Sequence, residues 1–461
     1  MDDHLDGAPV VAVPDLIVAA GTVLTMEPGR DPLTDTGIVV GGDRILALEP
    51  VDELRLRHPE TRVVGGPDHI ALPGLVNAHQ HLTGDRLIRS MIPDDLEPGR
   101  SIFEWAVPSH AAHTGDDDEL SATLSLVEAA CNGVTFTVEA GTVAHPDRVL
   151  SAFDRVGVGG TLGSWGWDVD GEPWAGSVDE VLDRQREVLR LTAGHPRVAG
   201  WVTLVGHDLM SDGLVTSASD LARTHGTGIT FHLSPTDADA ASYLDRTGRR
   251  PAVHLDELGV LGPHVLIAHG VHLDDVELER LLRSDTAIAY CPWAYLRLGQ
   301  GVTRAGRHIE FVERGGRVAL GCDAENAGDA IDILRAAALC AGLAKDMVAD
   351  ATRFGAHEAL HLATLGGARA LGLEHEIGSL TVGKRADIVV VDATGPEWVP
   401  RSPDPVLQLV WASDGRSVRH VVSSGRIVVE DAEPTGVDRS LLAVEAQRRH
   451  DRLVAAARLG R

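Results

Sequence analysis

The segment PGLVNAHQHL (Pro73–Leu82) is an apolar run that ends in two histidines separated by one residue. Side chains two positions apart in a β-strand point to the same side. His79 and His81 would therefore aim both imidazole rings at one point beyond the end of this strand. Taken alone, the pair is explained equally well as two solvated loop histidines.

Other strand ends carry the same chemistry. Three further apolar runs each lead to a side chain of the kind that binds metal ions: Gly228–Phe231 before His232, Val265–Ala268 before His269, and Val318–Gly321 before Asp323. A single such residue is more often a hydrogen-bonded residue of the core or rim. Four strands that end in this way indicate one shared site.

The segment between about Pro73 and Leu373 alternates apolar strands with longer helical patterns, which is typical of a parallel α/β architecture. We expect helices over 116–132, 177–192, 274–284 and 331–344. The predicted strands end near His79, Glu139, Leu162, His207, His232, His269, Tyr290 and Asp323. Eight strands favour a (β/α)8 TIM barrel over an open doubly wound sheet, and barrel enzymes place catalytic groups at these strand ends.

Both ends of the chain contain short apolar runs separated by glycine-rich turns, at 16–26, 37–40 and 45–48 and again at 386–392 and 418–429. Such runs predict antiparallel sheet. The final segment, Asp438–Leu459, has the pattern of a helix with an arginine-rich polar face.

The composition is that of an ordinary globular protein, with 44% hydrophobic and 24% charged residues among 461. A net charge of -27 argues against nucleic acid or an anionic membrane as partner. The four cysteines are far apart, the first residues lack the basic start of a signal peptide, and no apolar run has the length of a membrane helix. We therefore expect a cytoplasmic protein with a small-molecule substrate.

Three imidazoles and one carboxylate suit a borderline divalent ion such as Zn²⁺ or Fe²⁺. Such an ion lowers the pKa of a bound water to about 7 and so makes hydroxide available at neutral pH. Asp323 would then contact the metal and accept a proton. His269 would hydrogen-bond the water or the developing tetrahedral oxygen. We expect one divalent metal, with zinc first and iron or manganese as alternatives.

These residues resemble the amidohydrolase superfamily. PGLVNAHQHL is similar to its first-strand signature, and HGVHLDD (His269–Asp275) and LGCD (Leu320–Asp323) are similar to its sixth- and eighth-strand segments. GSLTVGKRADIVVVD (Gly378–Asp392) resembles the stretch that re-enters the family's small β-sandwich. The resemblance covers roughly residues 14 to 430. It is greatest to the aminohydrolase group, which contains cytosine, guanine and adenosyl-type deaminases and triazine hydrolases.

The resemblance implies a split small domain around a barrel: residues 14–72 and 377–433 as a β-sandwich, 73–376 as the barrel and 434–461 as a C-terminal helix. It implies metal ligands at His79, His81, His232 and Asp323, with His269 assisting. His207 occupies the position of a substrate-contacting histidine on the fourth strand. His272 and Trp105 fall in regions that line the substrate pocket in relatives, many of which are homo-oligomers.

The lysine content favours one metal over two. Many binuclear relatives bridge two metals with a carbamylated lysine on the fourth strand. The only lysines here, Lys345 and Lys384, lie outside the predicted barrel strands. A bridge through Glu139 is the less favoured alternative.

The chain departs from the deaminases of this group after the fifth strand. Those enzymes carry H-x-x-E, whose glutamate passes a proton to the substrate ring, whereas this chain reads His232-Leu233-Ser234-Pro235. Proline has no proton to give, and general acid–base catalysis contributes roughly 10²–10⁴-fold. Either another group substitutes, with Asp237 and Glu325 as candidates, or the reaction needs no ring protonation.

Two further motifs are interpreted as structural. His357–His361 spells the zinc-protease pattern H-E-x-x-H, but it lies in a helix expected outside the barrel. His308-Ile309-Glu310 lacks the P-C-x-x-C partner of the other zinc-deaminase fold. The strand-end tryptophans Trp165, Trp167 and Trp293 either stack on a planar substrate or close the barrel top.

The predicted function is hydrolysis of a C–N bond in a small cyclic or heteroaromatic compound by a metal-activated water. One alternative is a non-deaminating hydrolase of the same superfamily, which opens a cyclic amide or displaces another leaving group and would tolerate Pro235. Another is a catalytically silent homologue that only binds a ligand.

Overall fold

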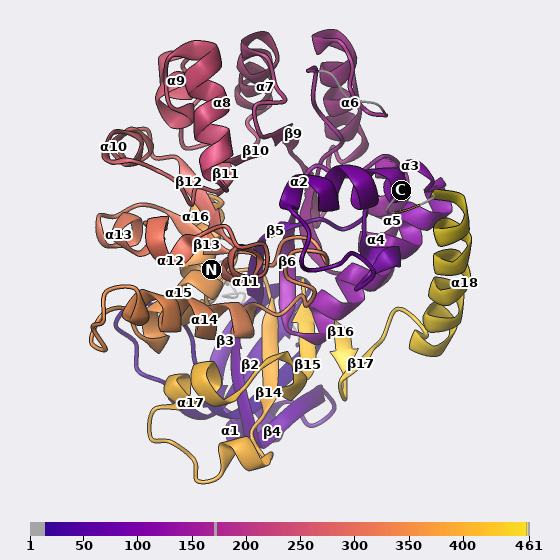
Figure 1. The fold of residues 1–461 in the computed structure, drawn as a ribbon. Coiled ribbons are helices and arrows are strands. Elements are labelled where there is room, and N and C mark those ends of the chain that lie inside the picture. Colours follow the sequence, from indigo (N-terminus) through magenta and orange to yellow (C-terminus); the bar gives the residue numbers. More distant parts are fainter. Residues whose placement is uncertain (1–13, 170–172, 458, 460–461) are drawn as a thin grey trace, which may run out of the picture.

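The computed structural model describes residues 14–169, 173–457 and 459 (Figure 1). The chain is of the α/β class, with two parallel sheets and one larger sheet to which both chain ends contribute. In Figure 1 the larger sheet lies at the bottom of the view, and the parallel strands with their helices lie above it.

The parallel strands include every strand predicted for the middle of the chain. One sheet has the order β5-β6-β7-β8 and the other β13-β12-β11-β10-β9. Their bounds are β5 Leu75–Gln80, β6 Val134–Glu139, β7 Gly159–Leu162, β8 Val198–Gly200, β9 Val202–Gly206, β10 Ile229–Leu233, β11 Val265–His269, β12 Ala287–Tyr290 and β13 Val318–Leu320. The eight predicted strand ends are confirmed, and the short strand β8 was not predicted.

The two parallel sheets adjoin at both edges. On one side only Trp201 separates β8 from β9 along the chain. On the other side the backbone N–H groups of Cys322 and Asp323, just after β13, donate to the carbonyl of His79 in β5 at 3.1 and 2.9 Å. Asp323 is thereby brought beside His79, although the two residues are far apart in sequence.

Helices connect or follow the parallel strands, and the four predicted helices are confirmed to within two residues at each end. The bounds of all these helices are α4 Gly115–Cys131, α5 Pro146–Val156, α6 Val178–Leu191, α7 Asp212–His225, α8 Asp237–Thr247, α9 Pro251–Glu257, α10 Asp275–Arg283, α11 Pro292–Arg297, α12 Val302–Ala305, α13 His308–Glu313, α14 Ile333–Asp346, α15 Ala356–Ala363 and α16 Leu365–Ala370. Side-chain caps fix several helix starts: Ser177 accepts from Glu180 N before α6, and Asp274 from Glu277 N before α10.

A run of short helices, none of them predicted, follows β5. It contains η1 Arg86–Ile88, α2 Pro98–Ser101, the π-helical turn η2 Ile102–Ala106 and α3 Val107–Ala111. Residues of α2, η2 and α3 form part of the cavity wall described below.

The larger sheet has eight strands in the order β17-β16-β15-β14-β4-β1-β2-β3. Its strands are β1 Leu16–Val23, β2 Leu33–Gly41, β3 Arg44–Pro50, β4 Arg62–Pro73, β14 Ile388–Asp392, β15 Val418–Ser423, β16 Arg426–Glu430 and β17 Glu433–Pro434, with α1 Val51–Arg57, η3 Pro396–Trp398, α17 Pro405–Ala412 and η4 Gly415–Ser417 between them. Most pairs are antiparallel as predicted, but β1 pairs with β4 in parallel. The strand β4, which contains two glycines and two prolines, was not predicted.

The C-terminal helix α18 spans Arg439–Ala457 and packs on η1, α3 and α4. Leu453 is its one fully buried described side chain, in a small cluster with Leu87 and Leu120. Arg449 and Arg452 both contact the buried carboxylate of Asp117 in the first turn of α4. The helix therefore holds α4, which leads into β6.

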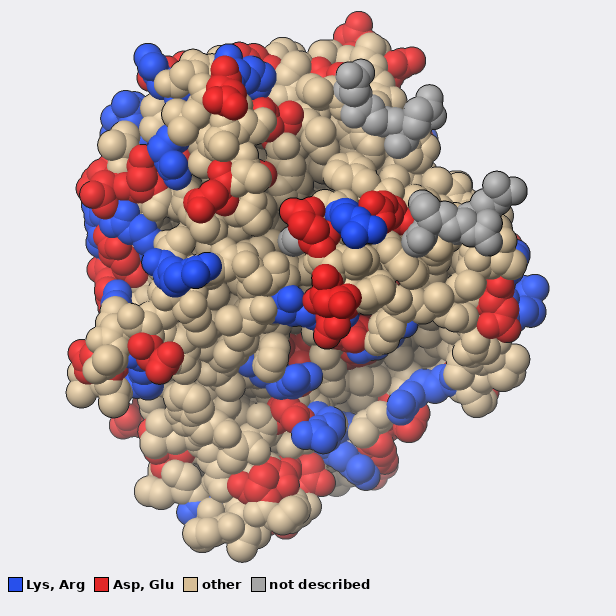
Figure 2. Space-filling view, viewed as in Figure 1, with Lys and Arg blue, Asp and Glu red and all other residues tan. Residues whose placement is uncertain are grey.

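Among the described helices, none combines the length and apolar composition needed to span a bilayer. On the face shown in Figure 2, basic side chains are interspersed with acidic ones.

We predict that Leu453→Ala lowers the free energy of unfolding by about 2–3 kcal/mol, because it leaves a cavity in a closed apolar cluster. Leu441→Ala on the same helix is the matched control, since Leu441 is 68% exposed. Its effect should stay within about 0.5 kcal/mol. Urea unfolding of both variants measures the difference, and equal effects would mean that α18 is not anchored through Leu453.

Candidate active site

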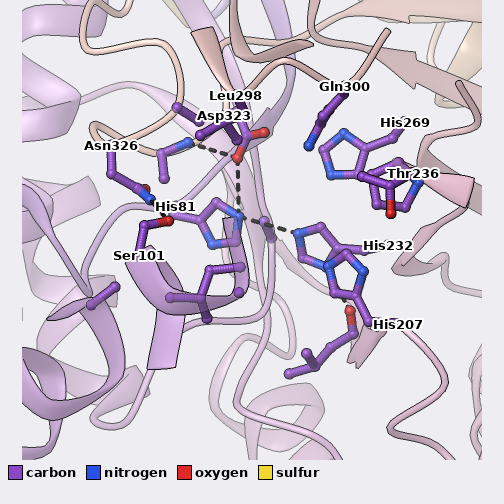
Figure 3. A pocket seen from close by; sticks show the side chains of 18 of the residues that line it. His81, Ser101, His207, His232, Thr236, His269, Leu298, Gln300, Asp323 and Asn326 are labelled. Atoms are coloured by element: carbon purple, nitrogen blue, oxygen red, sulfur yellow. Dashed lines mark hydrogen bonds and ion pairs between the residues drawn. The ribbon is translucent and has the colours of Figure 1, made fainter. Parts of the chain in front are cut away.

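The strand-end histidines converge, as Figure 3 shows for His81, His232 and His269. The ring of His79 lies 5.1 Å from that of His81, 4.9 Å from His232 and 5.2 Å from His269, measured between centroids. Asp323 Oδ1 lies 3.6 Å from His79 Nε2 and 3.3 Å from His81 Nε2. The structure thus brings together the five side chains that were predicted to meet.

Hydrogen bonds behind two of these rings fix which nitrogen faces the centre. His232 Nδ1 lies 2.6 Å from the carbonyl of Val205, which can only accept, so Nδ1 carries the hydrogen. His81 Nδ1 lies 3.2 Å from Thr142 Oγ1, and that hydroxyl donates to Glu139 Oε1 at 3.1 Å. The Nε2 lone pairs of both rings therefore point inward, where the two Nε2 atoms are 3.3 Å apart.

This arrangement fits a divalent cation. Lone-pair atoms that face one another at 3.3–3.6 Å repel unless a positive charge lies between them. Both ring nitrogens of His79 are buried without a hydrogen-bond partner. Burial also lowers the pKa of His79, His232 and His269, which keeps these imidazoles neutral and able to coordinate at pH 7. His₃Asp is a donor set that zinc and similar ions accept.

Left-handed backbone positions the ends of these strands. His207, Ser234, His269 and Asp323 have φ values of 52°, 49°, 78° and 68°, a region that residues other than glycine seldom occupy. Each such residue costs about 1–3 kcal/mol and persists only where its surroundings enforce it. Four of them at neighbouring strand ends indicate that the directions of these side chains are functionally constrained.

A cavity of about 610 Å³ opens at this centre. His81, His232, His269 and Asp323 lie in its wall, together with the predicted substrate residues His207 and His272. Trp105 does not line it. This helical segment contributes Ile102, Phe103, Ala106 and Val107 to the cavity wall instead.

The two predicted substrate histidines are held differently. The ring of His207 stacks on that of His232, with centroids 4.9 Å apart, and its Nδ1 lies 3.4 Å from Asp239. His272 Nε2 donates to the carbonyl of Gln300 at 2.7 Å, and its Nδ1 lies 2.6 Å from Asp237.

The segment after β10 contains the departure from H-x-x-E. Pro235 lines the cavity, and so do Asp237 and Asp239. The other candidate replacement, Glu325, does not line it. Its carboxylate accepts from Arg86 at 3.0 Å and Ser125 at 3.3 Å, and burial raises its pKa to about 8.

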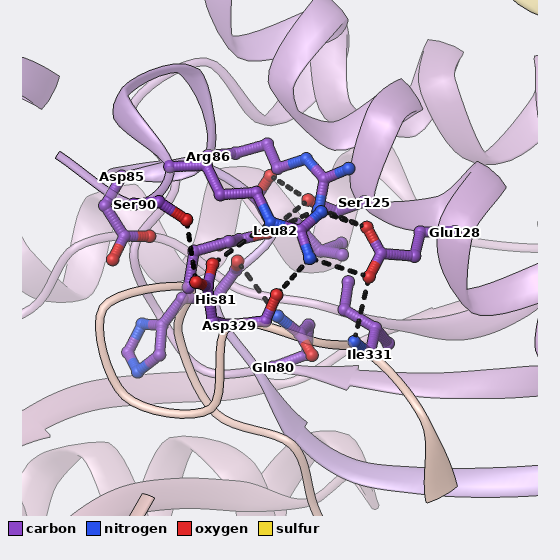
Figure 4. A network of polar contacts seen from close by, with 12 residues as sticks. Gln80, His81, Leu82, Asp85, Arg86, Ser90, Ser125, Glu128, Asp329 and Ile331 are labelled. Atoms are coloured by element: carbon purple, nitrogen blue, oxygen red, sulfur yellow. Dashed lines mark hydrogen bonds and ion pairs between the residues drawn. The ribbon is translucent and has the colours of Figure 1, made fainter. Parts of the chain in front are cut away.

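Glu325 belongs to a polar network that joins the loops after β5 and β13 to α4. Figure 4 shows Arg86, Glu128 and Asp329 of this network. Arg86 bridges Glu325 and Glu128, with contacts of 3.0 and 2.7 Å. Arg89 bridges Glu128 and Asp329, with contacts of 2.5 and 3.0 Å. The network fixes two of the loops that shape the cavity.

Glu139, the less favoured bridging ligand, has both carboxylate oxygens engaged by hydrogen bonds. Oε2 accepts from Gly141 N at 2.7 Å, and Oε1 accepts from the backbone and hydroxyl of Thr142 at 3.1 Å. Lys345 and Lys384 donate to backbone carbonyls far from the centre. The described residues that could hold a metal group as His79, His81 and His232, as His79, His269 and Asp323, and as a separate cluster around Asp118.

Of the remaining sequence motifs, the two histidine motifs lie outside the cavity wall. His357 and His361 are on α15, where His357 pairs with Asp404 at 2.8 Å. His308 on α13 donates to the carbonyl of His269 at 2.6 Å. Of the three tryptophans considered for stacking, Trp165 lines the cavity, whereas Trp167 and Trp293 do not.

Several cavity residues were missed by the sequence analysis. Thr142 lies three residues after the predicted end of β6, which is a signal that could have been used. Gln300 and Asn326 lie in loops and carry no local pattern that marks them.

Comparison with known proteins gives relatives over nearly the whole chain. Residues 70–428 match the model of the amidohydrolase family. A 5-methylthioadenosine/S-adenosylhomocysteine deaminase of Syntrophobacter fumaroxidans is 31% identical over 90% of this chain and 93% of its own. One from Natronomonas pharaonis is 31% identical over 97% of both.

Solved structures are also similar to this chain over nearly its whole length. An adenosine deaminase from Xanthomonas campestris with bound zinc has a TM-score of 0.90 and 27% identity, covering 96% of this chain and 99% of its own. The zinc complex of the atrazine chlorohydrolase TrzN from Arthrobacter aurescens TC1 has a TM-score of 0.83 at 22% identity, covering 94% of this chain and 100% of its own, and so shares the fold. The chain therefore belongs to the amidohydrolase family and is a hydrolase that acts on C–N bonds.

Proposed function

We propose that this protein is a metal-dependent deaminase that removes an amino group from the ring of an adenosine-type compound. The observation that carries the proposal is the convergence of four strand-end histidines and Asp323 at the base of a cavity. The names of the 31% identical relatives and of the zinc-containing neighbour support the substrate class.

In this proposal His79, His81, His232 and Asp323 hold one divalent ion, with zinc first among the ions that suit the set and iron or manganese as alternatives. When bound, the ion supplies Lewis-acid chemistry that makes water acidic near neutral pH. Thr142 and Glu139 keep the His81 ring in its inward-facing tautomer, as outer partners of metal ligands do in general.

Asp323 accepts the proton of the attacking water, and His269 hydrogen-bonds the oxygen that develops negative charge. His207 and His272 contact the substrate from the opposite wall. Gln300 adds a further recognition group: its Oε1 is buried without a partner in the cavity wall and suits a substrate N–H. Trp105 is not part of this proposal, because Phe103 and Ala106 take its place in the wall.

The fold supports this reading of the site. We infer that β8 and β9 are two parts of one strand, and that the two adjoining parallel sheets form one closed (β/α)8 barrel over residues 73–376, joined by the bonds from Cys322 and Asp323 to His79. Residues 14–72 and 377–433 form the split β-sandwich, and the C-terminal helix completes the chain. The cavity then opens at the end of the barrel where catalytic groups gather.

Pro235 favours a second candidate function. A hydrolase that displaces another leaving group or opens a cyclic amide needs no proton donor at this position. In the deaminase, Asp237 is the nearer substitute, since it lines the cavity and Glu325 does not.

Substrate turnover separates the two functions. The zinc-loaded protein is incubated with 5′-methylthioadenosine, S-adenosylhomocysteine, adenosine, guanine, a pterin and a triazine, and ammonia is assayed. We expect ammonia release to be fastest from a 6-aminopurine nucleoside. Turnover of any compound without ammonia would replace the deaminase with the second candidate.

Asp323→Asn separates an enzyme from a silent ligand-binding homologue. The variant should lose at least about 10²-fold in kcat, because the general base is gone. Product affinity, measured by calorimetry, should fall far less. Asp183→Asn, at an exposed position on α6, is the control and should leave both quantities unchanged. If the wild-type protein binds the product but has no measurable turnover, the protein is a catalytically silent homologue.

Thr142→Val tests the outer partner of His81. It removes the acceptor of the Nδ1 hydrogen, and we expect zinc affinity to fall about 10–100-fold in chelator competition. Thr137→Val is the matched control, since Thr137 is also buried, on β6, and its hydroxyl has no hydrogen-bond partner. Equal affinities in the two variants would show that Thr142 does not orient the ligand.

A further inference from the structure

A second group of histidines lies behind the cavity wall and converges on Asp118 of α4. The carboxylate accepts from His110 Nε2 at 3.0 Å, His113 Nδ1 at 2.9 Å, and both the ring and backbone nitrogens of His145 at 3.0 Å. The side chains of His110, His113 and Asp118 are fully buried. Burial alone would raise the pKa of Asp118, but the bonds from His110 and His113 outweigh it and hold the pKa well below its usual range.

The hydrogen-bond directions argue against a metal at this cluster. Trp165 Nε1 can only donate, and it lies 3.0 Å from His110 Nδ1, which must therefore accept. A neutral His110 then carries its hydrogen on Nε2 and points it at Asp118. No lone pair of His110 remains for a cation. At the active site His81 and His232 carry their hydrogens on Nδ1 instead, so their Nε2 lone pairs face one another.

The bond from Trp165 instead links the buried carboxylate to the cavity. Trp165 is 6% exposed and lines the cavity wall. Its indole is stacked on Trp174, with centroids 4.5 Å apart and planes 6° from parallel. Its backbone N–H donates to the carbonyl of Val143, next to the Thr142 that supports His81. Trp165 is thus fixed at its backbone, one face and its polar edge, on the same side of the cavity as His81.

We propose that Trp165 determines substrate specificity by packing against the heteroaromatic ring of the substrate, and that His110 and Asp118 are positioning residues that hold its indole in place. The proposal rests on the proposed function and adds a residue to its recognition surface. A fixed aromatic face favours a planar ring over an aliphatic group of similar size, because offset stacking adds to the gain from burial alone.

The expected effect is on substrate binding. Aromatic contacts contribute about 0.5–1.5 kcal/mol beyond burial, which corresponds to a KM change of up to about tenfold. The chain offers a matched pair of variants. His110→Phe and His113→Phe each remove one buried N–H donor to the same Asp118 oxygen, but only His110 also contacts Trp165 Nε1.

The two variants are compared by steady-state kinetics on the preferred nucleoside. We expect His110→Phe to raise KM about five- to tenfold with kcat changed less than threefold, and His113→Phe to leave KM within twofold. His110→Gln should restore KM, because its amide oxygen accepts from Trp165 and its amide nitrogen donates to Asp118. Equal KM values for the two phenylalanine variants would overturn the proposal.

A double-mutant cycle and a spectrum keep the test valid if one variant is unstable. In a Trp165→Phe background, which lacks the indole N–H, His110→Phe should raise KM no further. The stacked Trp165–Trp174 pair should also give a coupled circular-dichroism band that weakens in His110→Phe, persists in His113→Phe and is lost in Trp174→Phe. Additive KM effects, an unchanged band in His110→Phe, or a second equivalent of bound zinc that His110→Phe removes would each refute the positioning role.

These readouts also separate the two levels of the proposal. If no nucleoside is turned over, the proposed function fails, while the dichroism comparison still tests how Trp165 is held. If nucleosides are turned over but KM is indifferent to His110 and Trp165, the proposed function stands and the specificity role is wrong.

Discussion

The structure depends on a cluster of acceptor atoms that repel one another. The Nε2 atom of His81 lies 3.3 Å from both the Nε2 atom of His232 and the carboxylate of Asp323, in a buried centre where unbalanced lone pairs are costly. A shared divalent cation would remove that cost, and Thr142 and the Val205 carbonyl keep the lone pairs turned inward. The arrangement of the parallel strands can be understood as the scaffold that brings these atoms together.

Holding such a cluster requires backbone that would not form by itself. His269 and Asp323 adopt left-handed conformations directly at the strand ends, and Asp323 is tied to His79 through the bond to its carbonyl. Outside this layer, Arg86 and Glu128 fasten the neighbouring loops. The acceptor atoms are therefore surrounded first by strained backbone and then by the ion pairs that hold the neighbouring loops.

Much of this was predictable from the sequence, because parallel strands leave a strong trace. Buried strands appear as continuous apolar runs, and the residue that ends each run is visible, so His79, His81, His232, His269 and Asp323 could be named in advance. Trp105 is not among the residues that line the cavity, to which the π-helical turn that carries it contributes Ile102, Phe103 and Ala106. The strand β4 was missed because its Gly65-Gly66-Pro67 run has the composition of a turn. Gln300 was missed because loop residues carry no periodic signal.

Pro235 lines the cavity at a position where a side chain could otherwise supply a proton, so the proposed deamination requires another proton donor. The proposed chemistry requires a metal ion bound by the strand-end histidines and Asp323. Diffraction from zinc-loaded crystals at the zinc absorption edge would test it most directly. We expect one anomalous peak per chain, about 2.0–2.2 Å from the Nε2 atoms of His79, His81 and His232 and an oxygen of Asp323. The absence of a peak there, or a single peak at Asp118 instead, would contradict the account.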